Sequence, residues 1–297
     1  MKDGKGEIDM DINQIKQIAV IGSGAMGSQI AMVCALAGYH VTLQDINEES
    51  LVKAKQSLEG IMKRRVEKGR LSQDQVKRAF DRIRFESLLE EAVKNADFLI
   101  EAIVEKLEAK RALYAEVDRL APAHTIIASN SSTIVSSQMA DATCRPDKIC
   151  NMHFFNPALV MELVEIVQGP YTSEETAQIT FELAKRINKV PILLKKEISG
   201  FVANRILGKL MDEAIYLLEN GVATAEEIDL ACTKALNHPI GPFALIDLTG
   251  IDVHYYIRMQ RYQESGDEKM KPSQIVTELF AKGDFGRKTG KGFYTYS

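Results

Sequence analysis

The sequence lacks the features that mark several large classes of protein. Its four cysteines, Cys34, Cys144, Cys150 and Cys232, form no C-x-x-C pair and no cysteine–histidine cluster with zinc-ligand spacing, so we expect reduced thiols and no metal site. The formal net charge is only -4, which provides no broad basic field for a nucleic acid backbone. No apolar run approaches the roughly 20 residues needed to span a bilayer. These absences predict a soluble, cytoplasmic protein with no nucleic-acid or membrane partner.

The length of the chain and its first residues indicate the domain organisation. A chain of 297 residues exceeds one typical domain, so two domains are expected. Residues 1–14, MKDGKGEIDMDINQ, mix charges of both signs and contain no apolar core. This composition is unlike a secretory signal or an arginine-rich transit peptide, and we interpret the segment as a short flexible leader.

The segment IKQIAVIGSGAMGSQIAMVCALAGYHVTLQDIN contains a glycine motif between a strand pattern and a helix pattern. Gly22, Gly24 and Gly27 have G-x-G-x-x-G spacing, and Asp45 ends the next strand pattern 18 residues after Gly27. In this motif the first glycine permits a tight turn, the second lets the backbone approach a pyrophosphate, and the third lets the helix pack closely on the strand. The free N–H groups of the helix start then face the phosphates.

This context predicts a dinucleotide site, with NAD as the cofactor and FAD as the main alternative. A carboxylate at Asp45 would accept hydrogen bonds from ribose hydroxyls and repel a 2′-phosphate, and no arginine follows it, so NAD is favoured over NADP. We expect the cofactor loop to consist of Gly22, Ser23, Gly24, Ala25, Met26 and Gly27.

The remaining patterns divide the chain into two parts. Helix and strand patterns alternate to about residue 196, which is typical of a doubly wound, mostly parallel sheet. From Gly200 onward only helical patterns occur, including a run that starts at Pro242. We predict an α/β chain with a Rossmann-type domain over 15–198 and an all-helical domain over 199–297. Helix starts are indicated by capping-box pairs: Ser72 with Gln75, Thr172 with Glu175, and Thr224 with Glu227.

The apolar stretch HFFNPALVMELVEIV, residues 153–167, contains two titratable groups that need partners. Glu162 and Glu165 point to opposite faces of an extended segment, and Glu165 shares its face with Met161, Leu163 and Val167. We therefore expect Glu165 to be buried. A carboxylate on one nitrogen of His153 would orient the ring and leave the other nitrogen to exchange a proton with a substrate. A satisfied core pair is the alternative.

The other polar candidates are weaker. We favour structural roles for His40, His124, His238 and His254, which lie at strand starts, in a turn or within a helical run. Asn204 lies on an apolar helical stripe with Met211 and Ile215, so it is either a satisfied core amide or a group that faces a cleft.

With these residues in place, the chain resembles the L-3-hydroxyacyl-CoA dehydrogenase family, including its bacterial 3-hydroxybutyryl-CoA dehydrogenases. The resemblance extends from about Ile15 to the C-terminus. The motifs that carry it, in family order, are GSGAMG, EAIVE, SNSS, HFFNP, LVEI, GFVANR and GRKTGKGFYTY.

The resemblance implies NAD-dependent, reversible oxidation of a (S)-3-hydroxyacyl-CoA, with short chains favoured. His153 would be the catalytic base, Glu165 its partner, and Ser132 and Asn204 would bind the reacting oxygen. Threonine and serine are rearranged in NSST relative to the family, which leaves Ser132 as the best match. The cofactor contacts implied beyond the glycine loop are Asp45, Glu105, Lys110, Asn130, Ser132 and Lys288, and Asn156 would contact substrate.

Coenzyme A carries phosphates that need cationic partners, and the resemblance places its tail beside a helix that ends in KRRVEKGR. Lys63, Arg64 and Lys68 are the expected contacts. A solvated helix end, whose basic residues complement the helix dipole, is the alternative. The resemblance also implies a homodimer formed through the helical domain, and metabolism of fatty acids or butyrate.

Two other function classes stay open from the sequence. One is a related NAD-dependent dehydrogenase of a free 3-hydroxy acid such as L-gulonate, with no CoA; the basic cluster argues against it. The other is a sensor or structural protein that binds NAD without turnover. The complete set of Ser132, His153, Glu165 and Asn204 argues against that class.

Overall fold

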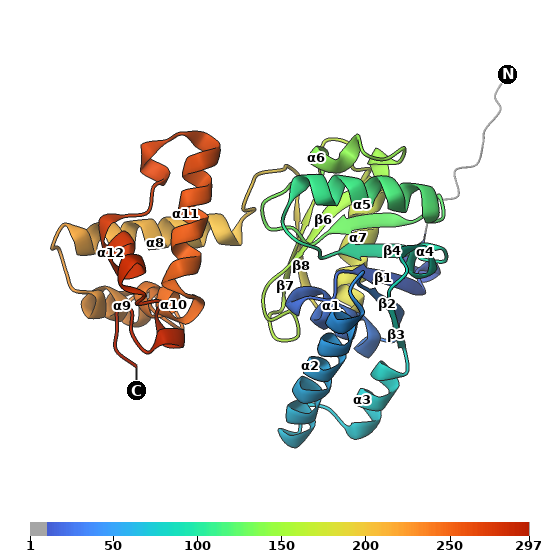
Figure 1. Cartoon of the computed structure of the whole chain (residues 1–297), viewed down its shortest axis with the longest axis horizontal. Helices are drawn as coiled ribbons and strands as arrows, with labels where there is room; N and C mark the ends of the chain where they lie inside the picture. Colours follow the sequence, from blue (N-terminus) through green and yellow to red (C-terminus); the bar gives the residue numbers. More distant parts are fainter. Residues whose placement is uncertain (1–10, 297) are drawn as a thin grey trace. The chain divides into compact units, whose positions relative to one another are not determined.

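A computed structural model describes residues 11–296, apart from the side chain of Glu264. The chain divides after Phe201 into two compact units, which are described separately below. Figure 1 shows the elements of each unit.

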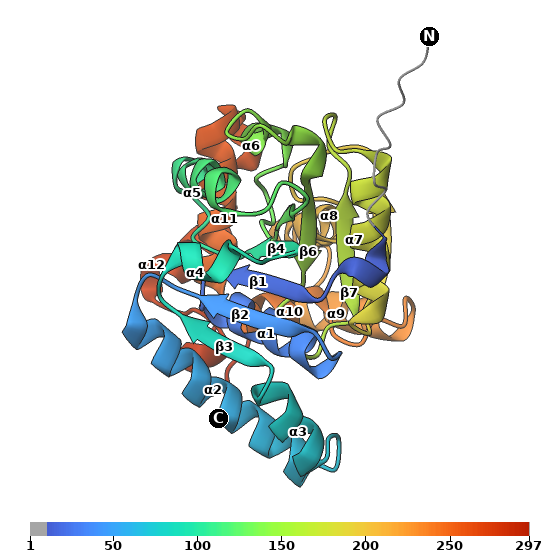
Figure 2. The ribbon, with the colours of Figure 1, turned by 90° about the vertical axis from the view of Figure 1, so that its right-hand side faces the viewer.

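The first unit is built on one eight-stranded sheet with the order β3-β2-β1-β4-β5-β6-β7-β8. Neighbouring strands are parallel except β6 and β7, which are antiparallel. Figure 2 shows the twist of β1, β2 and β3. The predicted Rossmann-type, mostly parallel sheet is confirmed. The strands are β1 (Gln17–Ile21), β2 (His40–Gln44), β3 (Ile83–Glu86), β4 (Phe98–Glu101), β5 (Ile126–Ser129), β6 (Ile149–Phe154), β7 (Leu163–Val167) and β8 (Val190–Leu194).

Helices cover both faces of this sheet and bury two apolar cores. On one face the core includes Ile30 of α1, Leu58 of α2 and Leu183 of α7, and on the other Tyr114 and Val117 of α5. The central strands β4, β5 and β6 are buried along their whole length, so a polar side chain on them requires an internal partner. The helices are α1 (Ala25–Leu36), α2 (Glu48–Glu67), α3 (Gln73–Phe80), α4 (Leu89–Val93), α5 (Leu107–Leu120), α6 (Ser137–Ala140) and α7 (Glu174–Arg186).

Two details of the first unit differ from the sequence expectations. Residues 1–10 of the expected leader lie outside the described residues, but Ile12–Gln14 form a 3-10 helix, and Arg186 donates a 2.7 Å hydrogen bond to Asn13. The end of the leader is therefore part of the fold. The predicted capping box of Thr172 and Glu175 is wrong, because α7 is capped by Ser173. The Thr172 hydroxyl is buried and donates a 2.5 Å hydrogen bond to the Ile149 carbonyl instead.

The second unit is helical, as predicted, and its described residues contain isolated bridges but no strand. The capping boxes at Ser72 and Thr224 and the start of a helix at Pro242 are also confirmed. The run after Pro242 is two helices rather than one, because Gly250 adopts φ 110° between them. The helices are α8 (Ala203–Glu219), α9 (Ala225–Lys234), α10 (Pro242–Thr249), α11 (Ile251–Ser265) and α12 (Gln274–Lys282).

A small core that includes Met211, Ile215, Phe243 and Ile246 joins these helices. Among residues 11–296, no helix combines the length and the apolar character that a bilayer span requires. The same residues contain no cluster of acidic, histidine or cysteine side chains suited to a metal ion.

Candidate active site

The glycine loop after β1 forms a cradle with open space above it. Gly22 adopts φ 99°, and a Cβ atom on Gly27 would lie 1.8 Å from the Gly22 carbonyl oxygen, so the turn and the start of α1 pack too closely for any side chain there. A Cβ atom on Gly24 would instead meet nothing within 4 Å. The backbone of Gly24 is therefore open to a close approach, which is what a pyrophosphate at the start of α1 requires.

Asp45 follows β2 and lies beside this cradle. Its Oδ2 accepts hydrogen bonds from the backbone N–H and the hydroxyl of Ser23, at 2.9 and 2.8 Å. Ile46, next to it, is 90% exposed and brings no positive charge. These groups fit the adenosine ribose of NAD, with a carboxylate where a 2′-phosphate would have to lie.

His153 and Glu165 meet across the antiparallel pair of strands. They are directly opposite in the register of β6 and β7, and His153 Nδ1 lies 2.9 Å from Glu165 Oε2. Side chains at opposed positions of antiparallel strands share a face, so the register brings these two together. His153 is 3% exposed and Glu165 is fully buried, in line with the expectation for Glu165. Met161, expected on the same buried face, is exposed because β7 begins only at Leu163.

The second nitrogen of His153 faces Ser132. His153 Nε2 lies 3.0 Å from Ser132 Oγ, which comes from the segment that follows β5. The rings of Phe155 and Phe201 lie 4.6 and 5.3 Å from the imidazole, centroid to centroid. The result is a hydrogen-bonded row of Ser132, His153 and Glu165 with two aromatic rings packed on the imidazole.

Glu105 holds the start of the serine segment, residues 131–137, which carries Ser132. Its Oε1 accepts hydrogen bonds from the hydroxyls of Ser131 and Thr133 and from the backbone N–H groups of Ser132 and Thr133. Burial alone would raise the pKa of Glu105, but these hydroxyls and the charge of Lys110 hold the pKa below its ordinary value. Glu105 is therefore a carboxylate at neutral pH.

Comparison with known proteins agrees with this geometry. Two family models match the chain: "3-hydroxyacyl-CoA dehydrogenase, NAD binding domain" over residues 17–198 and "3-hydroxyacyl-CoA dehydrogenase, C-terminal domain" over residues 200–296. The chain belongs to the 3-hydroxyacyl-CoA dehydrogenase family.

The relatives of this family match the chain over nearly its whole length. A 3-hydroxybutyryl-CoA dehydrogenase of Clostridioides difficile is 38% identical over 95% of this chain and 99% of its own length. The mitochondrial hydroxyacyl-coenzyme A dehydrogenase of Homo sapiens is 36% identical over 95% of this chain and 91% of its own. The crystal structure of (S)-3-hydroxybutyryl-CoA dehydrogenase from Ralstonia eutropha superposes with a TM-score of 0.88, at 36% identity, over 96% of this chain and all of that one.

These findings confirm the predicted family, the fold class, NAD as the cofactor and the assignment as an enzyme. The protein is an NAD-dependent 3-hydroxyacyl-CoA dehydrogenase. Its first unit corresponds to the NAD-binding domain of the family, whose glycine cradle and Asp45 are described above.

Lys110 has a position that its sequence motif did not reveal. It is 1% exposed, and its Nζ lies 2.5 Å from Glu101 Oε1 and 3.3 Å from Glu105 Oε2. In this dehydrogenase Lys110 therefore lies beneath Glu105. Its spacing from Tyr114 and Val117, which are buried on the same face of α5, was a signal for this burial.

Two further groups were missed from the sequence. Glu101 ends β4 in full burial and accepts hydrogen bonds from Lys110, the Ser129 hydroxyl and the Ile103 backbone. Asn151 lies two residues before His153 on β6 and donates a 2.9 Å hydrogen bond to the Ile134 carbonyl in the serine segment. Both lie at buried strand positions, where a polar residue in an apolar run is itself a signal.

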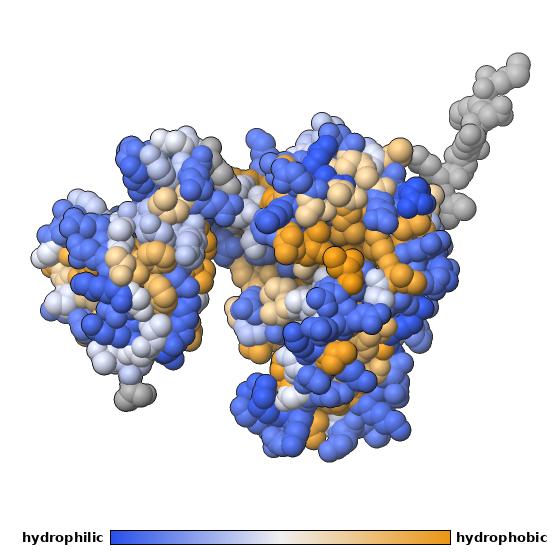
Figure 3. Space-filling model, in the orientation of Figure 1, coloured by the Kyte–Doolittle hydropathy of each residue, from blue (hydrophilic) through white to orange (hydrophobic). Residues whose placement is uncertain are grey.

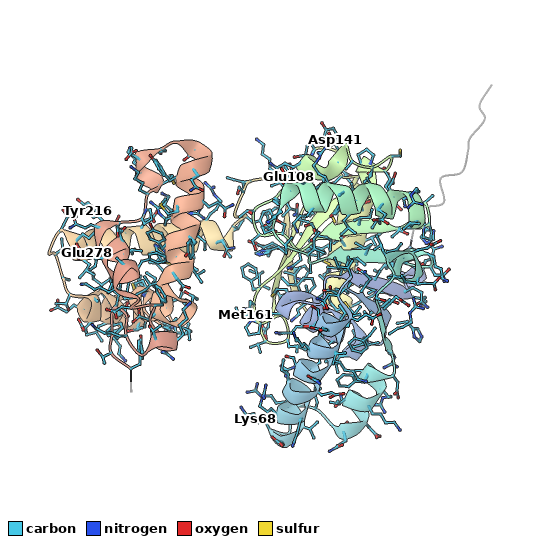
Figure 4. All side chains as sticks on the ribbon, viewed as in Figure 1. Lys68, Glu108, Asp141, Met161, Tyr216 and Glu278 are labelled. Carbon is cyan, nitrogen blue, oxygen red and sulfur yellow. The ribbon has the colours of Figure 1, made fainter. Side chains whose placement is uncertain are left out.

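The remaining predicted residues lie in three places. Asn130 accepts a 2.9 Å hydrogen bond from the Phe154 backbone N–H, beside the serine segment. Asn156 is exposed, immediately after β6. Lys63, Arg64 and Lys68 are exposed along the last turns of α2, and Figure 4 shows Lys68 at the tip of that helix, where the surface in Figure 3 is largely hydrophilic.

Two of the predicted residues belong to the second unit. Asn204 is half-buried in the first turn of α8, on the stripe that continues to Met211 and Ile215. Lys288 lies in the C-terminal motif, with its Nζ 2.6 Å from both carboxylate oxygens of Asp252.

Proposed function

We propose that the physiological substrates are short-chain (S)-3-hydroxyacyl-CoA thioesters, with 3-hydroxybutyryl-CoA as the principal one, and that His153 is the general base of the reaction. The observation that carries this proposal is the buried row of Ser132, His153 and Glu165, with distances of 3.0 and 2.9 Å. Relatives named 3-hydroxybutyryl-CoA dehydrogenase support the short chain length.

The row of residues suits transfer of the substrate hydroxyl proton. Glu165 accepts from His153 Nδ1–H, which leaves the lone pair of Nε2 on the side of Ser132, free to accept a proton. The C3 hydroxyl of the substrate gives its proton to Nε2, and the Glu165 carboxylate stabilises the imidazolium that forms. When held by the glycine loop and Asp45, NAD would supply the acceptor for the hydride that leaves C3. In the reverse direction His153 returns the proton to the oxygen of the 3-keto group.

Ser132 and Asn204 bind the reacting oxygen in this proposal. A hydroxyl and an amide N–H donate hydrogen bonds to the charge that develops on that oxygen, which lowers the barrier. Ser132 Oγ lies within hydrogen-bond distance of His153 Nε2. A substrate oxygen that gives its proton to Nε2 would therefore also lie next to the Ser132 hydroxyl. Asn130 and Asn156 border the nicotinamide and the acyl group.

The cofactor residues we propose are the glycine loop, Asp45, Glu105 with Lys110 beneath it, and Lys288. Glu105 is held by four donors of the serine segment, so it is fixed before the cofactor binds. The exposed cations of α2, Lys63, Arg64 and Lys68, attract the CoA phosphates. Arg65 is tied instead to the Leu159 carbonyl at 2.8 Å.

The cellular setting also belongs to this proposal. We place the protein in the cytoplasm, in the metabolism of short-chain fatty acids such as butyrate, as a homodimer. Exposed apolar side chains of the second unit, such as Ile206, Leu248 and Tyr256, provide apolar surface for a second copy.

The test follows NADH absorbance with purified protein and acetoacetyl-CoA, with parallel reactions that contain free acetoacetate or NADPH. We expect rapid NADH oxidation only with the CoA thioester, and slow oxidation of NADPH. Turnover of free acetoacetate at a similar kcat/KM would contradict the role of CoA. A higher kcat/KM with long-chain 3-ketoacyl-CoA would contradict the short-chain assignment.

A further inference from the structure

The segment that carries Ser132 is held at both ends by carboxylates. Glu105 binds Ser131, Ser132 and Thr133 at its start. At its other end, Glu197 Oε1 accepts hydrogen bonds from the Ser136 hydroxyl at 2.7 Å and from the Ser137 backbone N–H at 2.8 Å. Between these ends no regular helix or strand fixes the backbone, so the position of Ser132 depends on such side-chain contacts.

Glu197 comes from a stretch of chain that also contacts His153. It lies after β8, four residues before Phe201, whose ring is fully buried 5.3 Å from the imidazole of His153. Phe201 adopts φ 46°, which is uncommon for a residue other than glycine, and packs with Val167 and Leu194. The segment 195–201 thus touches both the serine segment and the histidine.

The contact between Glu197 and Ser136 is partly buried. Ser136 is 2% exposed. A Cβ atom on Gly169, just after β7, would lie 2.4 Å from Ser136 Oγ and 2.5 Å from Glu197 Oε1. The backbone of Gly169 therefore packs directly on the hydrogen bond, and there is no room for a side chain beside it. A hydrogen bond shielded in this way holds its geometry better than one in water.

We propose that Glu197 is a positioning residue of the dehydrogenase, which holds the serine segment so that Ser132 Oγ stays in register with His153 Nε2. The inference rests on the proposed roles of Ser132 and His153. Glu197 acts through Ser136 and Ser137 and takes no part in proton transfer. Since a misplacement of about 1 Å at a reacting group can lower a rate by about 100-fold, loss of this contact should lower kcat by about 10- to 100-fold.

The experiment is a double-mutant cycle with Glu197→Ala, Ser132→Ala and both together, in the full-length enzyme. Each variant is assayed for kcat with acetoacetyl-CoA, KM for NADH and thermal midpoint. We expect Glu197→Ala to lower kcat by about 10- to 100-fold with KM for NADH unchanged. In the Ser132→Ala background the same substitution should change kcat by less than about twofold, because the group that it positions is absent.

Two further variants separate positioning from general stability. Glu197→Gln keeps an oxygen that can accept both hydrogen bonds, so kcat should stay within about threefold of the wild type. Asp97→Ala is the matched control, since Asp97 also accepts two backbone N–H bonds, from Lys16 and Gln17, but at the amino end of β1. It should lower the thermal midpoint and leave kcat unchanged. If Glu197→Ala does not fold, Ser136→Ala takes its place in the cycle.

The outcomes distinguish this inference from the proposed function. Glu197 does not position Ser132 if the losses of kcat in Glu197→Ala and Ser132→Ala multiply in the double variant. The same conclusion follows if Glu197→Ala, or its replacement Ser136→Ala, keeps the wild-type kcat. In both cases the proposed roles of Ser132 and His153 still stand. If Ser132→Ala itself keeps the wild-type kcat, the proposed role of Ser132 fails and this inference fails with it.

Discussion

Both units of the molecule bury carboxylates, but the partners of these carboxylates differ. In the first unit Glu165 binds His153, whose other nitrogen faces Ser132. In the second unit Asp229 and Asp247 are similarly buried. Each accepts two backbone N–H bonds and one tyrosine hydroxyl: Asp229 from Phe243, Ala244 and Tyr294, and Asp247 from Phe293, Tyr294 and Tyr296.

The difference shows that burial of an acid does not by itself mark an active site. Backbone amides do not ionise near neutral pH and so cannot serve as acids or bases there, and burial together with the neighbouring Asp229 raises the pKa of the Tyr294 hydroxyl. Asp229 and Asp247 therefore anchor the C-terminal motif, whereas Glu165 orients a group that can accept a proton. A Cβ atom on Gly292 would lie 2.2 Å from Asp247 Oδ1, which explains a glycine in that motif.

The largest expected effect is on turnover, from His153→Ala. Removal of a general base costs typically 100- to 10,000-fold, so we expect a loss of kcat of about that size. NADH binding, measured by fluorescence, and the circular dichroism spectrum should be unchanged. Loss of folding in this variant would show instead that His153 and Glu165 are a structural pair like the acids of the second unit.

Asp229→Asn should have the opposite profile. The amide cannot accept all three hydrogen bonds, and its NH₂ group would face buried N–H donors, so the free energy of unfolding should fall by about 2–3 kcal/mol. The denaturant midpoint measures this change. At temperatures where the variant is folded, kcat should stay within about twofold of the wild type, and a large loss of kcat would remove the distinction between the two kinds of acid.

Asp45 is a third kind of carboxylate, half-exposed beside the glycine loop and bonded to Ser23. Asp45→Ala should raise KM for NADH by about 10-fold, because the ribose hydrogen bonds are lost, and should narrow the preference for NADH over NADPH. Steady-state kinetics with both cofactors measure the ratio. An unchanged preference would show that another group excludes the 2′-phosphate.

Glu105 gives a smaller, pH-dependent effect on stability. The pKa of Glu105 is lower in the folded than in the unfolded protein, so its ionised carboxylate stabilises the folded state. This stabilisation is complete at pH values above the ordinary pKa of 4.5 and is lost as the pH falls through the pKa of the folded protein. We expect the thermal midpoint of Glu105→Gln to lie below that of the wild type at pH 7, and the gap to narrow below about pH 4.5. A gap that is constant with pH would contradict this sign.

The parts of the molecule that were predictable from the sequence are local in the chain. The glycine loop and Asp45 lie within one strand-helix-strand unit, so their spacing determines their chemistry. Strand parity selected Glu165 over Glu162, but the register that places Glu165 opposite His153 depends on the antiparallel return of β7. The family resemblance supplied the roles of Ser132 and Asn204, which spacing alone left open.

The parts that were not predictable depend on distant or competing contacts. Glu197 and Ser136 are brought together by the end of β8 and the segment after β5, and no local pattern pairs them. Thr172 and Ser173 are both good caps, and only the buried Ile149 carbonyl decides between them. The Lys110 Nζ lies 2.5 Å from Glu101 Oε1, a contact between α5 and the end of β4 that local spacing does not reveal.

The central claim is that Glu165 serves catalysis through His153 rather than the stability of the sheet. Glu165→Gln tests it most directly, since the substitution keeps size and a hydrogen-bond acceptor but removes the charge. Measured with NADH and acetoacetyl-CoA, kcat should fall by about 100-fold or more, while NADH affinity and the thermal midpoint stay near those of the wild type. A wild-type kcat with a lowered midpoint would contradict the claim and place Glu165 with Asp229 and Asp247.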